Sequence, residues 1–140
     1  MNRTLGFDLG SKTLGVSVSD PLGMIARALT TLRFDSDDYD SALAQAQALI
    51  REQHADKVVL GLPRHMNGDI GVRGEISIAF KEKLESSGVE VVLWDERLTT
   101  VAANRILLQG DVSRKKRKKV IDQMAAVQIL QSYLDYSQRG

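Results

Sequence analysis

Hydrophobic and polar positions alternate in three short segments along the first third of the chain. Residues 4–9 and 14–19 are separated by a Gly-Ser-Lys-Thr turn, and the second segment alternates leucine or valine with glycine or serine. Residues 25–33 form a third segment after an Asp-Pro-Leu-Gly turn. A period of two is typical of strands, and turns of this composition join antiparallel neighbours. This part of the chain therefore predicts an antiparallel meander.

The pattern changes to the period of a helix after residue 36. Residues 37–54 carry apolar side chains three and four positions apart, and Ser36 or Asp37 can cap the helix that this spacing predicts. Further helices are expected at residues 74–87, 100–109 and 118–136, and short, continuously apolar strands at residues 57–62 and 89–94. Counting the main crossovers, the predicted order is βββαβαβα.

Apolar strands that alternate with helices are typical of a parallel sheet covered on both faces. We therefore expect residues 1–140 to form a single α/β domain around a mixed five-stranded sheet, with three antiparallel strands, two parallel ones and helices on both faces. Ligands bind such sheets beyond the C-terminal ends of the parallel strands. The places to search for chemistry are the end of the first strand, residues 62–74 and residues 95–97.

Composition narrows the class of protein. The 140 residues contain no cysteine, which excludes disulfides, thiol catalysis and cysteine-bound zinc and suits a reducing compartment. No apolar run approaches the ~18 residues of a membrane span, and the net charge is +1. We expect a soluble cytoplasmic protein with no membrane partner.

Acidic residues lie where the sheet and its last helix are expected to meet. Asp8 stands between apolar strand neighbours, where a carboxylate costs desolvation energy unless a cation meets it. Asp95 and Glu96 directly follow a buried strand, and Asp122 shares a helical face with two alanines. Structural roles are also open: Asp95 can act as a turn or cap residue, and Asp122 as a first-turn carboxylate favoured by the helix dipole.

Carboxylates that converge on one sheet edge repel one another and raise at least one pKa unless a divalent cation neutralises them. Oxygen ligands without cysteine or histidine favour Mg²⁺ or Mn²⁺ over zinc. Two such ions are the apparatus of in-line phosphoryl displacement. The chemistry expected from these residues is phosphodiester hydrolysis.

Four sequence blocks together carry a family resemblance. They are DLGSKTLG at 8–15, GLP at 61–63 with NG at 67–68, DERLTT at 95–100, and KKVID at 118–122 with AA at 125–126 and IL at 129–130. In this order they closely resemble the YqgF family, also called RuvX, of pre-16S ribosomal RNA nucleases that were once proposed to be Holliday junction resolvases. The match runs from residue 4 to about residue 134.

The resemblance implies a ribonuclease H-like fold and divalent-metal chemistry on phosphodiesters. Carried over residue by residue, it implies that Asp8, Glu96 and Asp122 form the catalytic, metal-binding set. Asn67 stands where aspartate is also common in the family, so we count no fourth carboxylate in that loop.

Basic residues near these positions are candidates for substrate binding. Lys12, in the first turn, could reach a phosphate or be merely solvated. Arg97 could clamp the scissile phosphate or pair with the carboxylates. Residues 111–140 carry a net charge of +4 against −3 for the rest, and six basic residues are consecutive: Arg114, Lys115, Lys116, Arg117, Lys118 and Lys119. The run could be a solvated helix entry, but placed before Asp122 it would hold a polyanion beside the metal site.

Few aromatic residues are available, and most fall in apolar patterns, so we expect recognition of backbone and shape more than base stacking. The glycine-rich segment 62–74 is expected to be a loop that closes on substrate.

The leading hypothesis is an Mg²⁺- or Mn²⁺-dependent endonuclease of structured RNA that matures the 5′ end of pre-16S ribosomal RNA, with a pre-ribosomal particle as a further partner. One alternative is a Holliday junction resolvase of branched DNA, which needs a dimer for two symmetric cuts. Others are a non-catalytic RNA-binding ribosome-assembly factor and a nucleotide-binding relic of the actin-like ATPases, for which the chain is too short. A monomer and a homodimer both stay open.

Overall fold

The computed structural model describes residues 3–65, 67–99 and 114–138, and within the last range it describes side chains from residue 124 onward. The helix expected at residues 100–109 lies outside the described residues, as do the side chains of Asp122 and of the basic run. No helix in the described part of the chain is long and apolar enough to cross a membrane.

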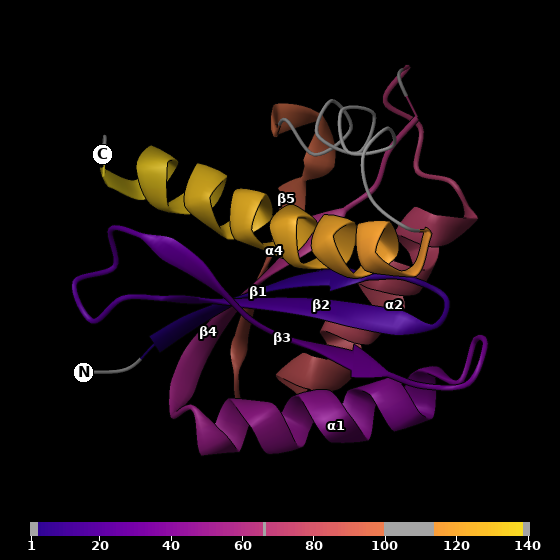
Figure 1. Ribbon diagram of the computed structural model, residues 1–140, viewed down its shortest axis with the longest axis horizontal. Helices are drawn as coiled ribbons and strands as arrows, with labels where there is room; N and C mark the ends of the chain where they lie inside the picture. The colour runs from indigo at the N-terminus through magenta and orange to yellow at the C-terminus, as the bar shows by residue number, and fades with distance from the viewer. Residues whose placement is uncertain (1–2, 66, 100–113, 139–140) are drawn as a thin grey trace.

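A mixed five-stranded sheet forms the centre of the molecule (Figure 1). Its strands are β1 (Arg3–Leu9), β2 (Thr13–Ser19), β3 (Ala26–Arg33), β4 (Ala55–Leu62) and β5 (Glu90–Asp95). They lie in the order β3-β2-β1-β4-β5, with β1, β2 and β3 antiparallel and with β4 parallel to both β1 and β5. The predicted mixed sheet is confirmed.

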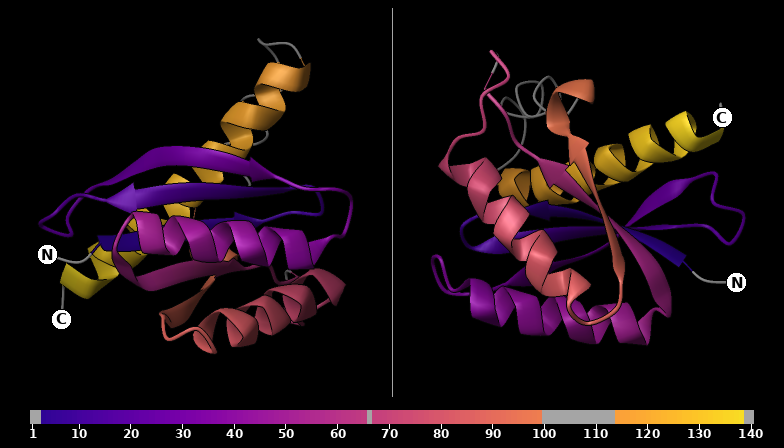
Figure 2. Two further views of the ribbon diagram at one scale, coloured as in Figure 1. Left: turned by 90° about the horizontal axis from the view of Figure 1, so that it is seen from below. Right: turned by 180° about the vertical axis from the view of Figure 1, so that it is seen from behind.

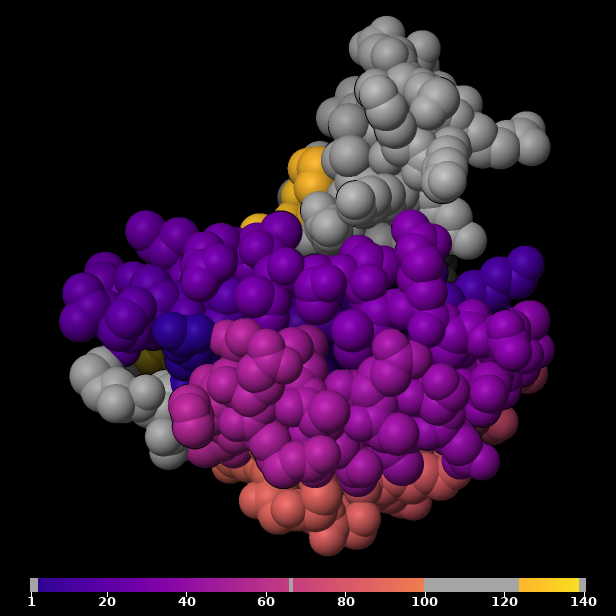
Figure 3. All heavy atoms as spheres, turned by 60° about the horizontal axis from the view of Figure 1, so that its bottom comes forward, coloured from indigo at the N-terminus to yellow at the C-terminus, as the bar shows by residue number. Residues whose placement is uncertain are grey.

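Helices cover both faces of this sheet, as predicted. Helices α1 (Tyr39–Glu52) and α2 (Val72–Glu85) lie on one face, and α4 (Arg114–Gln138) crosses the other (Figure 2). The buried side chains accordingly form two clusters, one between the sheet and α1 and α2, the other between the sheet and α4. In Figure 3 the purple side chains of α1 form much of the surface over the first face.

The approach of α4 to the sheet is close because small residues line it. A β-carbon at Gly6 of β1 would lie 2.7 Å from Leu130 Cβ and 2.9 Å from the carbonyl oxygen of Ala126. The Ser17 hydroxyl donates a hydrogen bond of 2.7 Å to that same carbonyl. Glycine in the strand and alanine in the helix therefore set the distance between the two layers.

The N-cap of helix α1 lies one residue beyond Asp37 and two beyond Ser36, the two predicted caps. Asp38 is the N-cap, and its carboxylate accepts a hydrogen bond of 3.2 Å from the Ser41 amide. Asp37 adopts a left-handed backbone (φ 62°), which an N-cap residue does not use. The predicted caps Ser36 and Asp37 are therefore wrong, because both residues belong to the turn that precedes the helix.

Candidate active site

The first predicted carboxylate, Asp8, lies at the C-terminal end of β1. Side chains alternate along a strand, so Asp8 shares with Gly6 the sheet face on which α4 packs. Phe7 pairs with Leu60, which makes Gly61 of β4 the lateral neighbour of Asp8. The Asp8 side chain is half-buried there. Its place at the end of the sheet is where the sequence predicted chemistry.

The second carboxylate, Glu96, reaches the same end of the sheet from β5. Glu96 opens the short 3-10 helix η1 (Glu96–Leu98), which directly follows the strand. A β-carbon at Gly61 would lie 3.3 Å from both Cγ and Oε1 of Glu96 and 2.6 Å from Ile129 Cδ1. The Glu96 side chain therefore folds back over β4 beneath α4, where its Oε1 atom is shielded from solvent. Asp8 and Glu96 thus lie at one end and on one face of the sheet.

The third predicted carboxylate, Asp122, belongs to α4, and its side chain is outside the described part of the structure. Ala126, one helical turn further on, lies over Gly6. The other end of α4 reaches the turn between β2 and β3, because Gln131 and Gln138 donate to the carbonyls of Met24 and Gly23. The helix therefore runs antiparallel to β1, with its first turns toward the end of the sheet that bears Asp8.

The donor chemistry at this end fits a hard divalent cation, since the half-buried groups are carboxylates. Among the side chains that the structure describes, no three histidine, aspartate or glutamate residues gather closely enough to hold a metal ion. The metal-binding set of Asp8, Glu96 and Asp122 stays a prediction.

Arg97 forms an ion pair with Asp95, the residue before the predicted metal ligand Glu96. Its Nε lies 3.1 Å from both Asp95 oxygens, and one terminal nitrogen lies 2.7 Å from Oδ2. The Arg97 amide also donates to Asp95 Oδ1, so Asp95 caps η1. This agrees with the alternative prediction that Asp95 is a turn or cap residue. The guanidinium hydrogen bonds lower the pKa of Asp95, and the same pairing raises the pKa of Arg97.

Arg64 adds a second cation to this ion pair. Its Nε lies 3.7 Å from Asp95 Oδ2, and a terminal nitrogen reaches the Gly68 carbonyl at 3.5 Å. Gly68 in turn lies beside Arg97, because a β-carbon there would be 3.4 Å from the Arg97 Nη1 atom. One aspartate therefore holds two guanidinium groups next to Glu96. The sequence showed Arg64 only as a basic residue in a glycine-rich loop.

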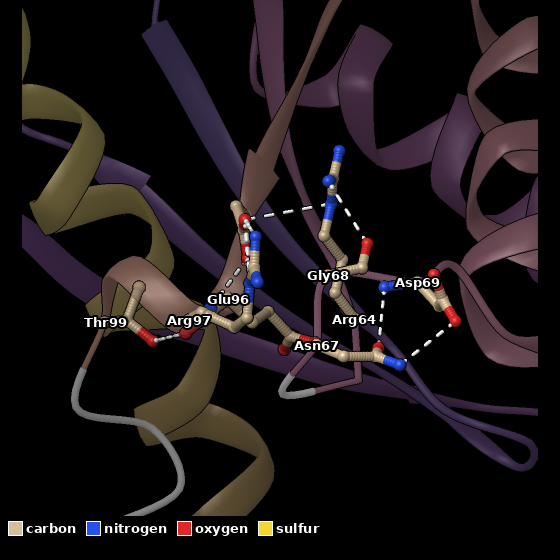
Figure 4. Close-up of polar contacts among 8 residues, drawn as sticks. Arg64, Asn67, Gly68, Asp69, Glu96, Arg97 and Thr99 are labelled. Atoms are coloured by element: carbon tan, nitrogen blue, oxygen red, sulfur yellow. Dashed lines mark hydrogen bonds and ion pairs between the residues drawn. The ribbon is translucent and has the colours of Figure 1, made fainter.

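The described contacts of the Asn67 side chain are with Asp69, and not with Asp8 or Glu96. Its side-chain amide donates to Asp69 Oδ2 at 3.1 Å, and its carbonyl oxygen accepts from the Asp69 amide at 3.0 Å (Figure 4). It therefore shapes the turn at Gly68, where the backbone is left-handed (φ 95°).

Arg73, in the first turn of α2, ties the end of β1 to both helices on the far face. One terminal nitrogen donates to the Leu9 carbonyl at 3.1 Å, and the other donates to the Tyr39 hydroxyl at 2.9 Å. Leu9 follows Asp8 directly, so Arg73 fixes the strand end that carries this carboxylate. No sequence signal identified this role, because the three residues come from separate segments.

The remaining candidate basic residues belong to elements that reach this end of the sheet. Lys12 is exposed in the turn between β1 and β2. The run from Arg114 to Lys119 lies within the first two turns of α4, which begins four residues before the predicted start. Their contacts with a substrate stay a prediction.

Comparisons with known proteins agree with the resemblance seen in the sequence. The family model described as "RuvX: Holliday junction resolvase" matches residues 2–136. A Bacillus subtilis protein is 54% identical over 134 residues, covering 95% of this chain and 97% of the relative. A Geobacillus kaustophilus protein is 56% identical at the same coverage, and both relatives are named "Putative pre-16S rRNA nuclease".

Solved structures share the fold at low sequence identity. RuvC of T. thermophilus, in complex with a Holliday junction substrate, aligns with a TM-score of 0.65 and 15% identity over all of this chain and 97% of that one. The fowlpox virus Holliday junction resolvase aligns with a TM-score of 0.56 and 18% identity, covering 96% and 99% of the two chains. The fold is therefore the ribonuclease H-like fold of these nucleases. With a family match over nearly its whole length and relatives above half identity, the chain belongs to the RuvX (YqgF) family of nucleases.

Proposed function

We propose that this protein is a divalent-metal-dependent endonuclease that cleaves structured RNA in the 5′-end maturation of pre-16S ribosomal RNA. Residues 1–140 would act as one nuclease domain. The observation that carries the proposal is the shared position of Asp8 and Glu96 at one end and on one face of the sheet, beneath the helix that contains Asp122.

In this proposal Asp8, Glu96 and Asp122 hold Mg²⁺ or Mn²⁺. When bound, the cation neutralises the carboxylates and stabilises the negative charge that develops on the phosphodiester. The chain contributes the placement of the ligands. Gly61 leaves the space that Glu96 fills, and Arg73 holds the strand end next to Asp8.

Cations around the carboxylates would bind the phosphate backbone. Asp95 fixes the Arg97 guanidinium, and this group keeps N–H donors beyond those used in the ion pair. Lys12 lies in the turn after β1, and the run from Arg114 to Lys119 begins the helix that leads to Asp122. These positions surround one end of the sheet, as a track for a polyanion requires.

The names of the relatives favour ribosomal RNA as the substrate, and a cytoplasmic location follows from that substrate. The second candidate is resolution of branched DNA, which the description of the family model favours. That reaction needs two symmetric cuts and hence a dimer. A protein that stays monomeric at assay concentration would contradict it.

The decisive experiment measures cleavage of pre-16S precursor RNA and of a four-way DNA junction, with Mg²⁺, with Mn²⁺ and with chelator. Asp8→Asn is expected to lose cleavage at least a hundredfold while keeping the fold. Asp40→Asn is the matched control, because the Asp40 side chain is 90% exposed on α1, across the sheet from α4. Equal activity in wild type and Asp8→Asn would reject the proposal, and RNA binding without cleavage under any metal would indicate an assembly factor.

A further inference from the structure

An aromatic cluster lies next to the candidate active site. Trp94, near the end of β5, contacts two tyrosines of α4. The Tyr133 ring meets it nearly edge-on, with centroids 5.6 Å apart and planes at 79°, and the Tyr136 ring lies 5.5 Å away at 57°. The indole nitrogen of Trp94 donates to the Ser132 hydroxyl at 3.0 Å. The indole is thus fixed from two sides by α4.

The inner tyrosine of this cluster is itself anchored. The Lys57 ammonium lies 3.1 Å from the Tyr133 hydroxyl and 5.6 Å from the ring centroid. Glu90 holds the same ammonium at 3.3 Å. The hydrogen bond to Tyr133 is the main reason that the pKa of Lys57 is raised. Tyr133 therefore serves as a fixed support behind Trp94.

The outer side of the cluster faces solvent. An open hollow of about 570 Å³ is lined by Trp94, Leu98, Ser132, Asp135 and Tyr136. Leu98 and Tyr136 are each 64% exposed. Exposed apolar surface beside an aromatic ring favours contact with a flat, partly apolar group.

Trp94, in the lining of the hollow, is a close neighbour of the candidate active site in the sheet. Trp94 pairs with Gly61, the residue against which Glu96 lies, and Glu96 follows Trp94 by two positions. Two residues of extended chain span at most about 7 Å. A group stacked at Trp94 would therefore lie close to a phosphate at the cation site that Glu96 is proposed to help form.

We propose that this hollow stacks an unpaired nucleobase of a single-stranded stretch of the substrate, next to the phosphate to be cleaved. This inference rests on the proposed function, and it adds that the substrate has an unpaired base next to the phosphate that is cleaved. Stacking on an aromatic platform is tolerant of sequence because every base has a π face.

The rim of the hollow favours a base over the other flat or charged groups of a nucleic acid. The Asp135 carboxylate repels a phosphate but accepts hydrogen bonds from the amino groups of bases. The Ser132 hydroxyl accepts the indole N–H and donates to the Leu98 carbonyl at 3.4 Å, so it connects Trp94 with Leu98 in the lining of the hollow. A second copy of the chain is a poorer occupant, because two exposed apolar side chains fall far short of the ~800 Å² per partner of a stable interface.

Trp94 is the only tryptophan of the chain, so its fluorescence reports on the hollow directly. Wild-type protein in chelator is titrated with a short single-stranded RNA and with an abasic strand of the same length. Saturable quenching by the RNA and little by the abasic strand is expected. Equal quenching by the two strands, or none by the RNA, would overturn the inference.

Substitutions at the exposed wall test the same point independently. Tyr136→Ala is expected to weaken RNA binding about tenfold, since stacking on one aromatic ring contributes about 1–3 kcal/mol per base, and Tyr136→Phe is expected to restore it. Leu98→Ala is likewise expected to weaken RNA binding. Its matched control Leu22→Ala is expected to leave binding unchanged, because Leu22 is 72% exposed in the turn between β2 and β3 and does not line the hollow. Unchanged affinity in Tyr136→Ala, or a dimer that this change dissociates without affecting RNA binding, would reject the stacking site.

A third variant separates this inference from the proposed function. Asp8→Asn is expected to lose cleavage and to keep the RNA-induced quenching, because Asp8 does not line the hollow. If Asp8→Asn cleaves normally while Tyr136→Ala binds weakly, the catalytic proposal fails and the stacking site stands. The reverse pattern rejects the stacking site alone.

Discussion

Glu96 lies against the backbone of Gly61, with its Cγ and Oε1 atoms 3.3 Å from the position that a β-carbon of residue 61 would take. Glycine is thus the residue that allows a carboxylate from β5 to cross β4 beneath α4. A backbone position in β4 therefore affects the placement of Glu96, the proposed metal ligand that follows β5.

Gly61→Ala is expected to disturb both the core and the site. The new methyl group would lie 2.6 Å from Ile129 Cδ1, which forces repacking that costs about 1–3 kcal/mol. It would also displace Glu96 by a few tenths of an ångström, for which we expect about a tenfold loss of cleavage. Denaturant unfolding and cleavage kinetics measure the two effects.

The double variant Gly61→Ala/Ile129→Val separates these effects, because valine lacks the Cδ1 atom. Stability is expected to recover in large part, while cleavage stays low. If cleavage recovers together with stability, Glu96 has no special dependence on Gly61.

The ion pair of Asp95 predicts a defined dependence of stability on pH. Pairing with Arg97 holds the pKa of Asp95 below its ordinary value of 3.8. A carboxyl whose pKa is lowered by folding stabilises the protein above 3.8, and this contribution is lost as the pH falls through the folded pKa. The pair is partly exposed, so the contribution is about 0.5–1 kcal/mol.

Asp95→Asn is therefore expected to lower the free energy of unfolding by a constant amount between pH 5 and 8, and by progressively less toward pH 3. Asparagine can still accept the hydrogen bond from the Arg97 amide, so the cap of η1 is retained. Denaturant midpoints for both proteins across this range measure the difference. A difference that grows toward low pH would contradict the assignment.

The parts of this fold that follow from periodicity were predictable from the sequence. Alternation in residues 14–19 and apolar runs at 57–62 and 89–94 led to the mixed sheet that the structure has. The position of Asp8 at a strand end also follows from the pattern. Local turn geometry was less predictable. The N-cap of α1 is Asp38 and not Asp37, because the backbone of Asp37 is left-handed.

Contacts between distant segments were not predictable from one sequence. Arg64 meets Asp95, and Trp94 meets Tyr136, only because the sheet order brings β4, β5 and α4 together. Spacing along a chain describes faces of single elements, whereas these pairs depend on which elements become neighbours. The sequence therefore predicted that Asp8 and Glu96 lie at the end of the sheet, but it predicted neither the second guanidinium nor the aromatic hollow.

Arg73 joins three elements, and its removal is expected to loosen the end of β1. Arg73→Met loses the hydrogen bonds to the Leu9 carbonyl and the Tyr39 hydroxyl, which costs about 1.5–3 kcal/mol for a charged donor in a part-buried place. Tyr39→Phe removes one of these bonds together with the exposed hydrogen bond from the Tyr39 hydroxyl to Asp37, and it is expected to cost less than about 1 kcal/mol. Denaturant unfolding measures the loss of stability in both variants. Cleavage is expected to fall in Arg73→Met more than in Tyr39→Phe, and the opposite order would show that Leu9 needs no support from Arg73.

The run from Arg114 to Lys119 predicts how binding depends on salt. Each phosphate that a basic residue neutralises adds about −0.7 to −0.9 to the slope of log affinity against log salt concentration. Replacing Lys115 and Lys116 by glutamine is expected to make that slope less negative by about one to two, if both contact phosphate. Lys81→Gln/Lys83→Gln is the matched control with the same change of charge, because both lysines lie on α2, across the sheet from α4. Only the pair in α4 should change the slope; equal changes in both double variants would mean that the overall charge of the protein, and not this run, attracts the nucleic acid.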